Sequence, residues 1–279
     1  MQLVRNGMMA AHKLNMTKTP IHSGSNLFTD FMDPVVALQL HGILMITAFW
    51  FIFPMAILSA RYFKIELSQK IFSSMLWFQS HRALALLGIG FVTVGFACVM
   101  IHRDWTWVST KNKERFSHSV LGMMVIIMMV LQAMIGFMRC RVGHVKRPIF
   151  NWFHRLFGLS IWLLAQTVIL LATWFKSGGL MPDQRLGELP RATMIVYWFL
   201  TLVLISALEL CQTSQKVADG LSANEESVHY ALYTEEQLNF LAARTKVVSA
   251  KASLWTMICI SFALLTGAMG YYIVLAVGK

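Results

Sequence analysis

Six long apolar runs, separated by polar segments, dominate the pattern of this chain. They cover residues 35–60, 79–101, 117–139, 150–174, 192–212 and 253–277. Each is close to the roughly 20 residues that a helix needs to cross about 30 Å of hydrocarbon. Only a helix lets one segment satisfy its own backbone hydrogen bonds in lipid. The pattern therefore predicts an all-α bundle of about six transmembrane helices, the first of them kinked at Pro54.

The polar segments divide the chain into four parts. We expect an N-terminal tail at 1–34, a transmembrane core at 35–212, a polar linker at 213–252 and a last transmembrane helix at 253–279. Leucines in the linker (Leu232, Leu238 and Leu241) could line one face of a short amphipathic helix at the membrane surface. The N-terminal tail lacks the continuous apolar stretch of a cleaved signal peptide, so the first span is expected to direct insertion unless sequence upstream is missing.

Composition agrees with a membrane protein and argues against a soluble domain and against a nucleic-acid-binding protein. Of the 279 residues, 57% are hydrophobic and only 13% are charged, whereas roughly a quarter are charged in a soluble domain. The net charge of +11 comes from basic residues between apolar runs. These basic residues do not alternate with aromatic residues along a stripe, so no nucleic-acid partner is expected. The four cysteines show no CxxC spacing and are read as buried thiols.

Lysine and arginine counts predict the orientation of the chain. Residues 20–34 contain none, whereas Arg61, Lys64 and Lys70 follow the first span. By the positive-inside rule, the N-terminus lies outside and the loop 61–78 lies in the cytoplasm. The later loops are nearly balanced in charge, so this prediction rests on the first span.

Four of the nine histidines lie near the starts of four consecutive spans, namely His41, His81, His118 and His154. The other five lie in tails, loops or span ends, where solvent exposure is the simpler interpretation. An ionisable side chain inside a membrane helix is costly and indicates function. Consecutive spans alternate in direction, so we expect His41 with His118 at the outer level and His81 with His154 at the inner level.

Two histidine pairs at two depths fit two b-type haems, each with one imidazole on either side of the iron. Gly122 and Gly158 follow His118 and His154 by one helical turn and could leave flat space for a porphyrin, although helix packing explains such glycines equally well. Zinc or iron transport is the rival interpretation. It would require carboxylates beside the histidines, and the interiors of the first four spans have essentially none.

Several stretches resemble the cytochrome b561 family. They are HGILMITAFWFIFPMAILSARYFK, WFQSHRALALLG, FSHSVLGMMVIIMMVLQAMIGF and FNWFHRLFGLSIWLLAQ. The likeness is strong over residues 35–175 and is greatest to the branch found beside DOMON domains in ferric-chelate-reductase-like proteins. The resemblance implies a four-helix core holding two haems b, with His41 and His118 as ligands of the outer haem and His81 and His154 as ligands of the inner one.

The same resemblance implies an oxidoreductase that moves electrons across the membrane. A cytoplasmic small-molecule donor, typically ascorbate, would reduce an acceptor such as monodehydroascorbate or a ferric chelate on the other side. Arg61 matches a basic residue linked with the donor and haem site, although it could equally be a positive-inside residue at the membrane surface. Lys64, Arg82 and Arg155 are further candidates for contacts with the donor or with the haem propionates. The two arginines suit this role because a guanidinium can bind both oxygens of a carboxylate.

Two alternatives to a stand-alone reductase remain open on the sequence. The chain could be a haem-bearing membrane subunit that passes electrons within a larger complex, or a non-redox membrane scaffold. The 34 residues before the first span are too few for a DOMON domain, a sandwich of on the order of 100 residues. A homodimer in the lipid bilayer is compatible with the sequence, which does not reveal the oligomeric state.

Overall fold

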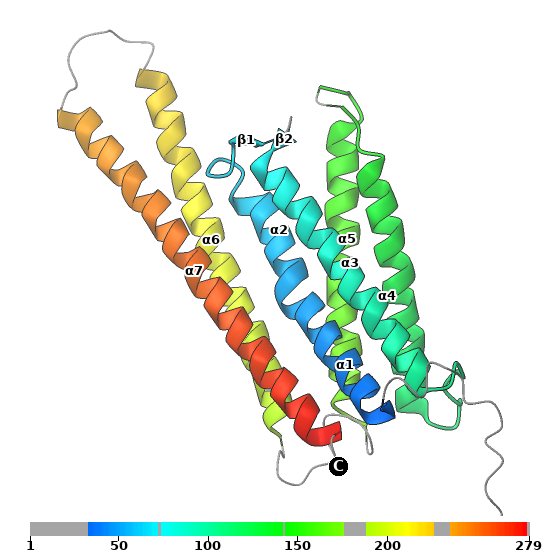
Figure 1. Ribbon diagram of the computed structural model, residues 1–279. Helices are drawn as coiled ribbons and strands as arrows, with labels where there is room; N and C mark the ends of the chain where they lie inside the picture. Colours follow the sequence, from blue (N-terminus) through cyan, green and yellow to red (C-terminus); the bar gives the residue numbers. More distant parts are fainter. Residues whose placement is uncertain (1–32, 72–73, 142, 176–187, 226–234, 278–279) are drawn as a thin grey trace, which may run out of the picture. The chain divides into compact units, whose positions relative to one another are not determined.

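The computed structural model describes residues 33–71, 74–141, 143–175, 188–225 and 235–277. Of these, it describes the residues between 216 and 244 by their backbone only. All elements lie in one compact unit, Pro34–Lys279 (Figure 1). Of the expected tail at 1–34, residues 1–32 lie outside the described ranges, as does the leucine at position 232.

The described residues contain six helices long and apolar enough to cross a membrane, which confirms the predicted all-α bundle. The first span combines α1 (Pro34–Ile46), a π-helix (Thr47–Ile52) and α2 (Phe53–Tyr62). A small hairpin of β1 (Lys70–Ile71) and β2 (Ser74–Met75) then leads into the remaining helices. These are α3 (Leu76–His102), α4 (Lys113–Phe137), α5 (Arg147–Ala172), α6 (Leu189–Glu225) and α7 (Glu235–Val277).

The π-helix lies directly before Pro54, where the sequence predicts a kink. The Phe53 N–H bonds to the Ala48 carbonyl, five residues back, which leaves the Phe49 carbonyl free of its usual α-helical donor. Pro54 has no N–H, so the Trp50 carbonyl also loses its donor. Side chains from other helices replace both: Trp162 Nε1 donates to Phe49 O at 3.0 Å, and the Tyr197 hydroxyl donates to Trp50 O at 3.3 Å.

Contacts between helices divide the bundle into a central first span with helices around it. The α1 segment packs against α3 and α7, α2 packs against α3 and α6, and the π-helix also contacts α5. Two further pairs, α4 with α5 and α6 with α7, lie side by side (Figure 1). Buried aromatic rings support this centre: Trp50 stacks on Tyr197 with ring centroids 4.2 Å apart, and Tyr197 lies 5.1 Å from Phe262.

The last two helices are longer than the predicted spans. The segment 213–252, expected as a polar linker, contains the end of α6, the undescribed residues 226–234 and the first part of α7. Within it, Lys251 of α7 is only 1% exposed and donates to the Tyr62 carbonyl at 2.8 Å and to Gln215 Oε1 at 2.9 Å. It also forms an ion pair with Glu66. A buried charge needs such partners, and these join α6 and α7 to the end of α2.

Candidate functional site

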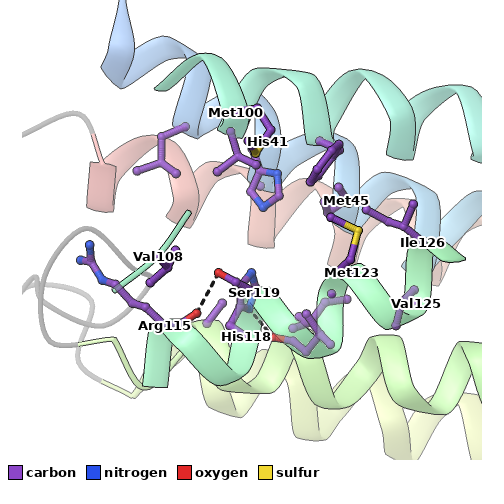
Figure 2. A pocket seen from close by; sticks show the side chains of 18 of the residues that line it. His41, Met45, Met100, Val108, Arg115, His118, Ser119, Met123, Val125 and Ile126 are labelled. Carbon is purple, nitrogen blue, oxygen red and sulfur yellow. Dashed lines mark hydrogen bonds between the residues drawn. The ribbon is translucent and has the colours of Figure 1, made fainter. Parts of the chain in front are cut away.

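We call His41 of α1 and His118 of α4 the first pair, because their rings lie close together. The two ring centroids are 6.4 Å apart, with an angle of 73° between the ring planes. The Nδ1 of His41 lies 2.8 Å from the Gly95 carbonyl and that of His118 lies 3.0 Å from the Val168 carbonyl. Because a carbonyl can only accept, each Nδ1 carries the proton and each Nε2 is left with its lone pair. Figure 2 shows both rings on the cavity between their helices.

The second pair, His81 and His154, repeats this geometry between α3 and α5. Its ring centroids are 6.3 Å apart, again at 73°. The Nδ1 of His81 lies 2.8 Å from the Ala56 carbonyl. Among the described residues, His154 Nδ1 has no hydrogen-bond partner. The Phe150 ring, one turn earlier on α5, stacks on His154 at 5.8 Å. Three imidazoles are thus fixed by the backbone of a neighbouring helix, and one is not.

The two pairs lie at different depths along the helices. On α3, His81 precedes Gly95, the partner of His41, by 14 positions. On α5, His154 precedes Val168, the partner of His118, by the same number. At about 1.5 Å per residue this spacing is about 21 Å, less than the roughly 30 Å of a hydrocarbon core. Both pairs therefore fit within one membrane, one towards each face.

The spacing within each pair fits a single metal ion held from both sides. A metal–imidazole bond of about 2 Å on each side, plus about 1 Å from each nitrogen to its ring centre, separates the ring centroids by about 6 Å. Elsewhere in the described ranges, no group of three or more His, Cys, Asp or Glu side chains is placed to hold a metal ion. The residues present thus suit a cofactor that supplies its own equatorial ligands, as haem does.

A largely apolar cavity surrounds the first pair. Its walls include Met45, Met123 and Val125, which Figure 2 shows on the side of the two histidines away from Arg115. Gly122 also lines it, and a Cβ there would meet only Val168, at 3.8 Å. Apolar walls with an open glycine face suit a porphyrin. At one end the lining becomes polar, with Arg103, Thr106, Arg115 and the ring of His102.

The other glycines near the histidines differ in what an added Cβ atom would contact. A Cβ on Gly95 would lie 3.3 Å from Leu44 and Met45 of the first span, so this glycine allows close helix packing. A Cβ on Gly136 would lie 3.6 Å from His154, at the second pair. A Cβ on Gly158 would lie 2.7 Å from the amide nitrogen of Gln132, which is too close for a real contact.

A basic group lies at the end of the bundle beyond the second pair. We define it as Lys64, Arg82, Arg139, Arg147 and Arg155. The Arg139 guanidinium lies 4.6 Å from the centre of the Phe78 ring, and Lys64 Nζ lies 5.1 Å from that of Trp77. Burial, and then the neighbouring charges of Arg155 and Arg139, lower the pKa of Lys64. Burial, and then Arg147, lower the pKa of Arg139. Mutual repulsion of this kind favours an anionic ligand.

Arg61 has a partner within the protein. Its Nη2 lies 3.0 and 2.9 Å from the two carboxylate oxygens of Glu209 on α6. The Tyr62 hydroxyl donates to the same carboxylate at 2.9 Å. Both charged side chains are 47% exposed. The Arg61 charge still contributes to the lowered pKa of Lys64, so it lies within electrostatic range of the basic group.

Several residues near these sites, among them Arg147 of the basic group, were not singled out from the sequence. His102 lines the cavity of the first pair although it ends a span, and Arg139 lies over two aromatic rings. Gln132 donates to the His154 carbonyl at 2.7 Å. A polar residue inside an apolar run was a signal for Gln132. Nothing in the sequence pattern marks His102 or Arg139 as different from other residues at span ends.

Residues 40–176, which contain all four paired histidines, match the eukaryotic cytochrome b561 family. The chain is 28% identical over 165 residues to ferric-chelate reductase 1 of Bos taurus, and 26% identical over 165 residues to that of Homo sapiens. These regions are 59% of this chain and 26% of each relative. A match to ferric-chelate reductase 1 of Mus musculus has 25% identity and covers 75% of this chain and 33% of the relative. No solved structure matches the chain.

The chain belongs to the cytochrome b561 family and is a ferric-chelate-reductase-like member of it. It is an integral, multi-pass membrane protein. This family supports transmembrane electron transfer as the class of activity and implies haem b as the cofactor. The matched regions span only about a quarter to a third of the length of these relatives.

Proposed function

We propose that this chain transfers electrons across the membrane through two b-type haems, each held by one histidine pair. His41 and His118 would bind one haem, and His81 and His154 the other. The observation that carries this proposal is the repeated pair geometry, with ring centroids 6.4 and 6.3 Å apart. When bound, haem iron would supply the one-electron chemistry, and its binding by two histidines would disfavour oxygen binding.

The contribution of the protein is to orient the imidazoles. Carbonyls of Gly95, Ala56 and Val168 fix the tautomer of three of them, which leaves the lone pair on Nε2 for a metal ion. The apolar cavity walls keep water from the first pair. Side-chain hydrogen bonds from Trp162 and Tyr197 to the π-helix support the segment between the two levels.

The electron donor is an anion such as ascorbate, which binds at the basic group near the second pair. This end faces the cytoplasm in the orientation derived from Arg61, Lys64 and Lys70, and the N-terminus then lies on the other side. Lys64 and Arg139 carry partly buried positive charges that an anionic donor would compensate. Arg61 contributes to the same positive field from its ion pair with Glu209.

The electron acceptor is also a small anion, monodehydroascorbate or a ferric chelate, at the opposite face. Support comes from Arg103, Arg115 and Thr106, which make the polar end of the first cavity. The ferric-chelate reductase names of the relatives agree with this choice. A partner domain could accept the electron instead, and it would approach the same polar end.

Haem content in purified variants tests the pairing. The intact protein is expected to hold two haems per chain with a reduced α-band after dithionite. H81A and H154A should each lose one and the same haem, and H41A and H118A the other. H144A serves as the matched control, because His144 lies in an exposed loop and its Nδ1 accepts from Lys146 N. An intact protein without an α-band would contradict the proposal. So would an H118A variant in which both haems remain bound and six-coordinate.

Vesicles test the direction of transfer. With ascorbate on the side of the basic group and ferricyanide on the other, reconstituted protein should show haem reduction followed by ferricyanide bleaching. Haems that ignore ascorbate but respond to dithionite would remove ascorbate as the donor while leaving the haem assignment intact.

A further inference from the structure

His154 differs from the other three paired histidines in its surroundings. His41, His81 and His118 each place Nδ1 within 3.0 Å of a main-chain carbonyl of another helix. Within the described ranges, His154 Nδ1 is buried and has no such partner. A metal-binding imidazole ordinarily donates its second N–H, because this bond fixes the tautomer and makes the ring a stronger ligand. The second pair therefore lacks one expected acceptor.

Gln132 of α4 is the polar side chain that reaches this residue. Its Nε2 donates to the main-chain carbonyl of His154 itself at 2.7 Å. Its Oε1 is buried and, over the described part of the chain, also has no partner. One carboxamide thus holds the backbone of His154 and carries a free acceptor, next to a residue with a free donor. A buried amide oxygen and a buried ring nitrogen are each costly to leave without a hydrogen-bond partner.

The surrounding residues leave room for this amide. Gly158 lies one turn after His154 on the same face of α5, and a Cβ there would be 2.7 Å from Gln132 Nε2. Gly136 lies one turn after Gln132, and a Cβ there would be 3.6 Å from the His154 ring. Gly158 therefore leaves the space that the Gln132 amide occupies, whereas a methyl group at Gly136 would make only an ordinary contact with His154.

We propose that Gln132 is the positioning residue of the second pair: its carboxamide holds the His154 backbone and presents Oε1 to His154 Nδ1–H when Nε2 binds haem iron. This inference rests on the proposed haem assignment. The hydrogen bond would give the imidazole more negative character, which stabilises the ferric state and lowers the midpoint potential of that haem. The first pair is fixed by backbone carbonyls and does not depend on Gln132.

Redox titration and electron paramagnetic resonance of Q132L and Q132E test this role. Q132L should raise the midpoint potential of the second-pair haem, change its low-spin signal and weaken haem binding by about 10–100-fold. The first-pair haem, identified by its loss in H41A, should stay unchanged. Q132E keeps an acceptor oxygen of the same reach, so its potential should be at or below that of the intact protein.

A double-mutant cycle with Gly158 separates positioning from general packing. G158A places a methyl group where the amide lies, so it should shift the second-pair potential in the same direction as Q132L. In Q132L the amide is already gone, and adding G158A should therefore change little. Q166L is the matched control, because Gln166 is a buried amide that accepts from Trp50 Nε1 at 3.0 Å. It should leave the second-pair potential unchanged.

Three outcomes would overturn the inference. They are an unchanged second-pair potential in Q132L, equal shifts of both haems in that variant, and full additivity of Q132L with G158A. An intact protein without haem would instead refute the proposed function, and the α-band of the intact protein distinguishes that case before any variant is compared. If Q132L does not accumulate, Q132E and G158A still give opposite predictions for the potential.

Discussion

At the scale of single residues, the protonation state of Lys64 determines part of the positive charge that an anionic donor would bind. Lys64 is the residue of the basic group whose protonation is most open to change, because burial and neighbouring cations lower its pKa below the usual lysine value. Its charge is therefore lost at a lower pH than that of an exposed lysine. Arginine holds its charge across the same range.

Lys64 is expected to make donor binding sensitive to alkaline pH. Donor affinity should be constant while Lys64 is protonated and should fall as pH rises through its lowered pKa. K64R should hold its affinity to higher pH, and K64Q should be weak throughout. The Kd for ascorbate, measured between pH 6 and about pH 10, checks this, with K111R as the control away from the basic group. Parallel profiles for all four proteins would exclude Lys64 from the donor site.

Variants of the Arg61–Glu209 ion pair distinguish two roles for the arginine, attraction of the donor and a positive-inside residue at the membrane surface. If the guanidinium helps to attract the donor, E209Q should release it from the carboxylate and lower the KM for ascorbate, whereas R61Q should raise it. The pair is half exposed, so its loss should change the free energy of unfolding by only about 0–1 kcal/mol. Unchanged KM values in both variants would leave Arg61 as a positive-inside residue only.

At the scale of elements, the π-helix of the first span is where side chains of α5 and α6 replace missing backbone hydrogen bonds. Its freed carbonyls receive Trp162 from α5 and Tyr197 from α6. The Tyr197 side chain is fully buried, and its ring also stacks on Trp50. Irregular backbone inside a membrane needs such replacements, because lipid offers no hydrogen bonds.

Removing the Tyr197 hydroxyl should therefore destabilise the bundle. Y197F keeps the ring stacking but leaves the Trp50 carbonyl without its donor, at a cost of about 1 kcal/mol. Unfolding in mixed micelles of increasing denaturing detergent would measure the difference. Y271F is the matched control, since Tyr271 is 61% exposed and its hydroxyl should matter little. Equal stability of the two variants would mean that another group satisfies the carbonyl.

The sequence pattern predicted the helices and the histidine pairs better than the hydrogen bonds that position the histidines. Apolar runs located all six spans, and alternation of direction predicted which histidines lie together, because both follow from length and topology. The Nδ1 partners of His41, His81 and His118 are main-chain carbonyls, which every residue carries, so no residue type marks them. The contact between Gln132 and His154 depends on the rotation of α4 against α5, which one sequence does not specify.

At the scale of the whole molecule, α6 and α7 are joined to the remaining helices by a cluster of charge at the end of α2. Lys251 is fully buried and contacts Tyr62, Glu66 and Gln215. Its ammonium also lies 5.6 Å from the centre of the Phe63 ring. These contacts lie beside Arg61 and Glu209, so the packing of α7 and the position of the expected donor side are coupled.

Breaking this ion pair should loosen α7. K251M leaves Glu66 without its cation, and loss of one partner of a buried pair typically costs about 3–5 kcal/mol. The double variant K251M/E66Q should be more stable than K251M alone, because no unpaired charge remains. Proteolysis and unfolding midpoints would measure both, with K246M at an exposed position of α7 as the control. A double variant as unstable as K251M would mean that Gln215 and the Tyr62 carbonyl matter more than Glu66.

The π-helix has a consequence for insertions and deletions in this part of the chain. A wide turn absorbs one extra residue without much turning the two halves of the helix against each other. Deleting a residue between 47 and 52 would restore regular winding and leave α1 in nearly the same register relative to α2. Deleting a residue in the regular turns between His41 and the π-helix would instead turn His41 away from His118 by about 100° and shift it by about 1.5 Å, while Arg61 stayed in place. A change of length is therefore expected to be tolerated better within the π-helix than in the regular turns beside it.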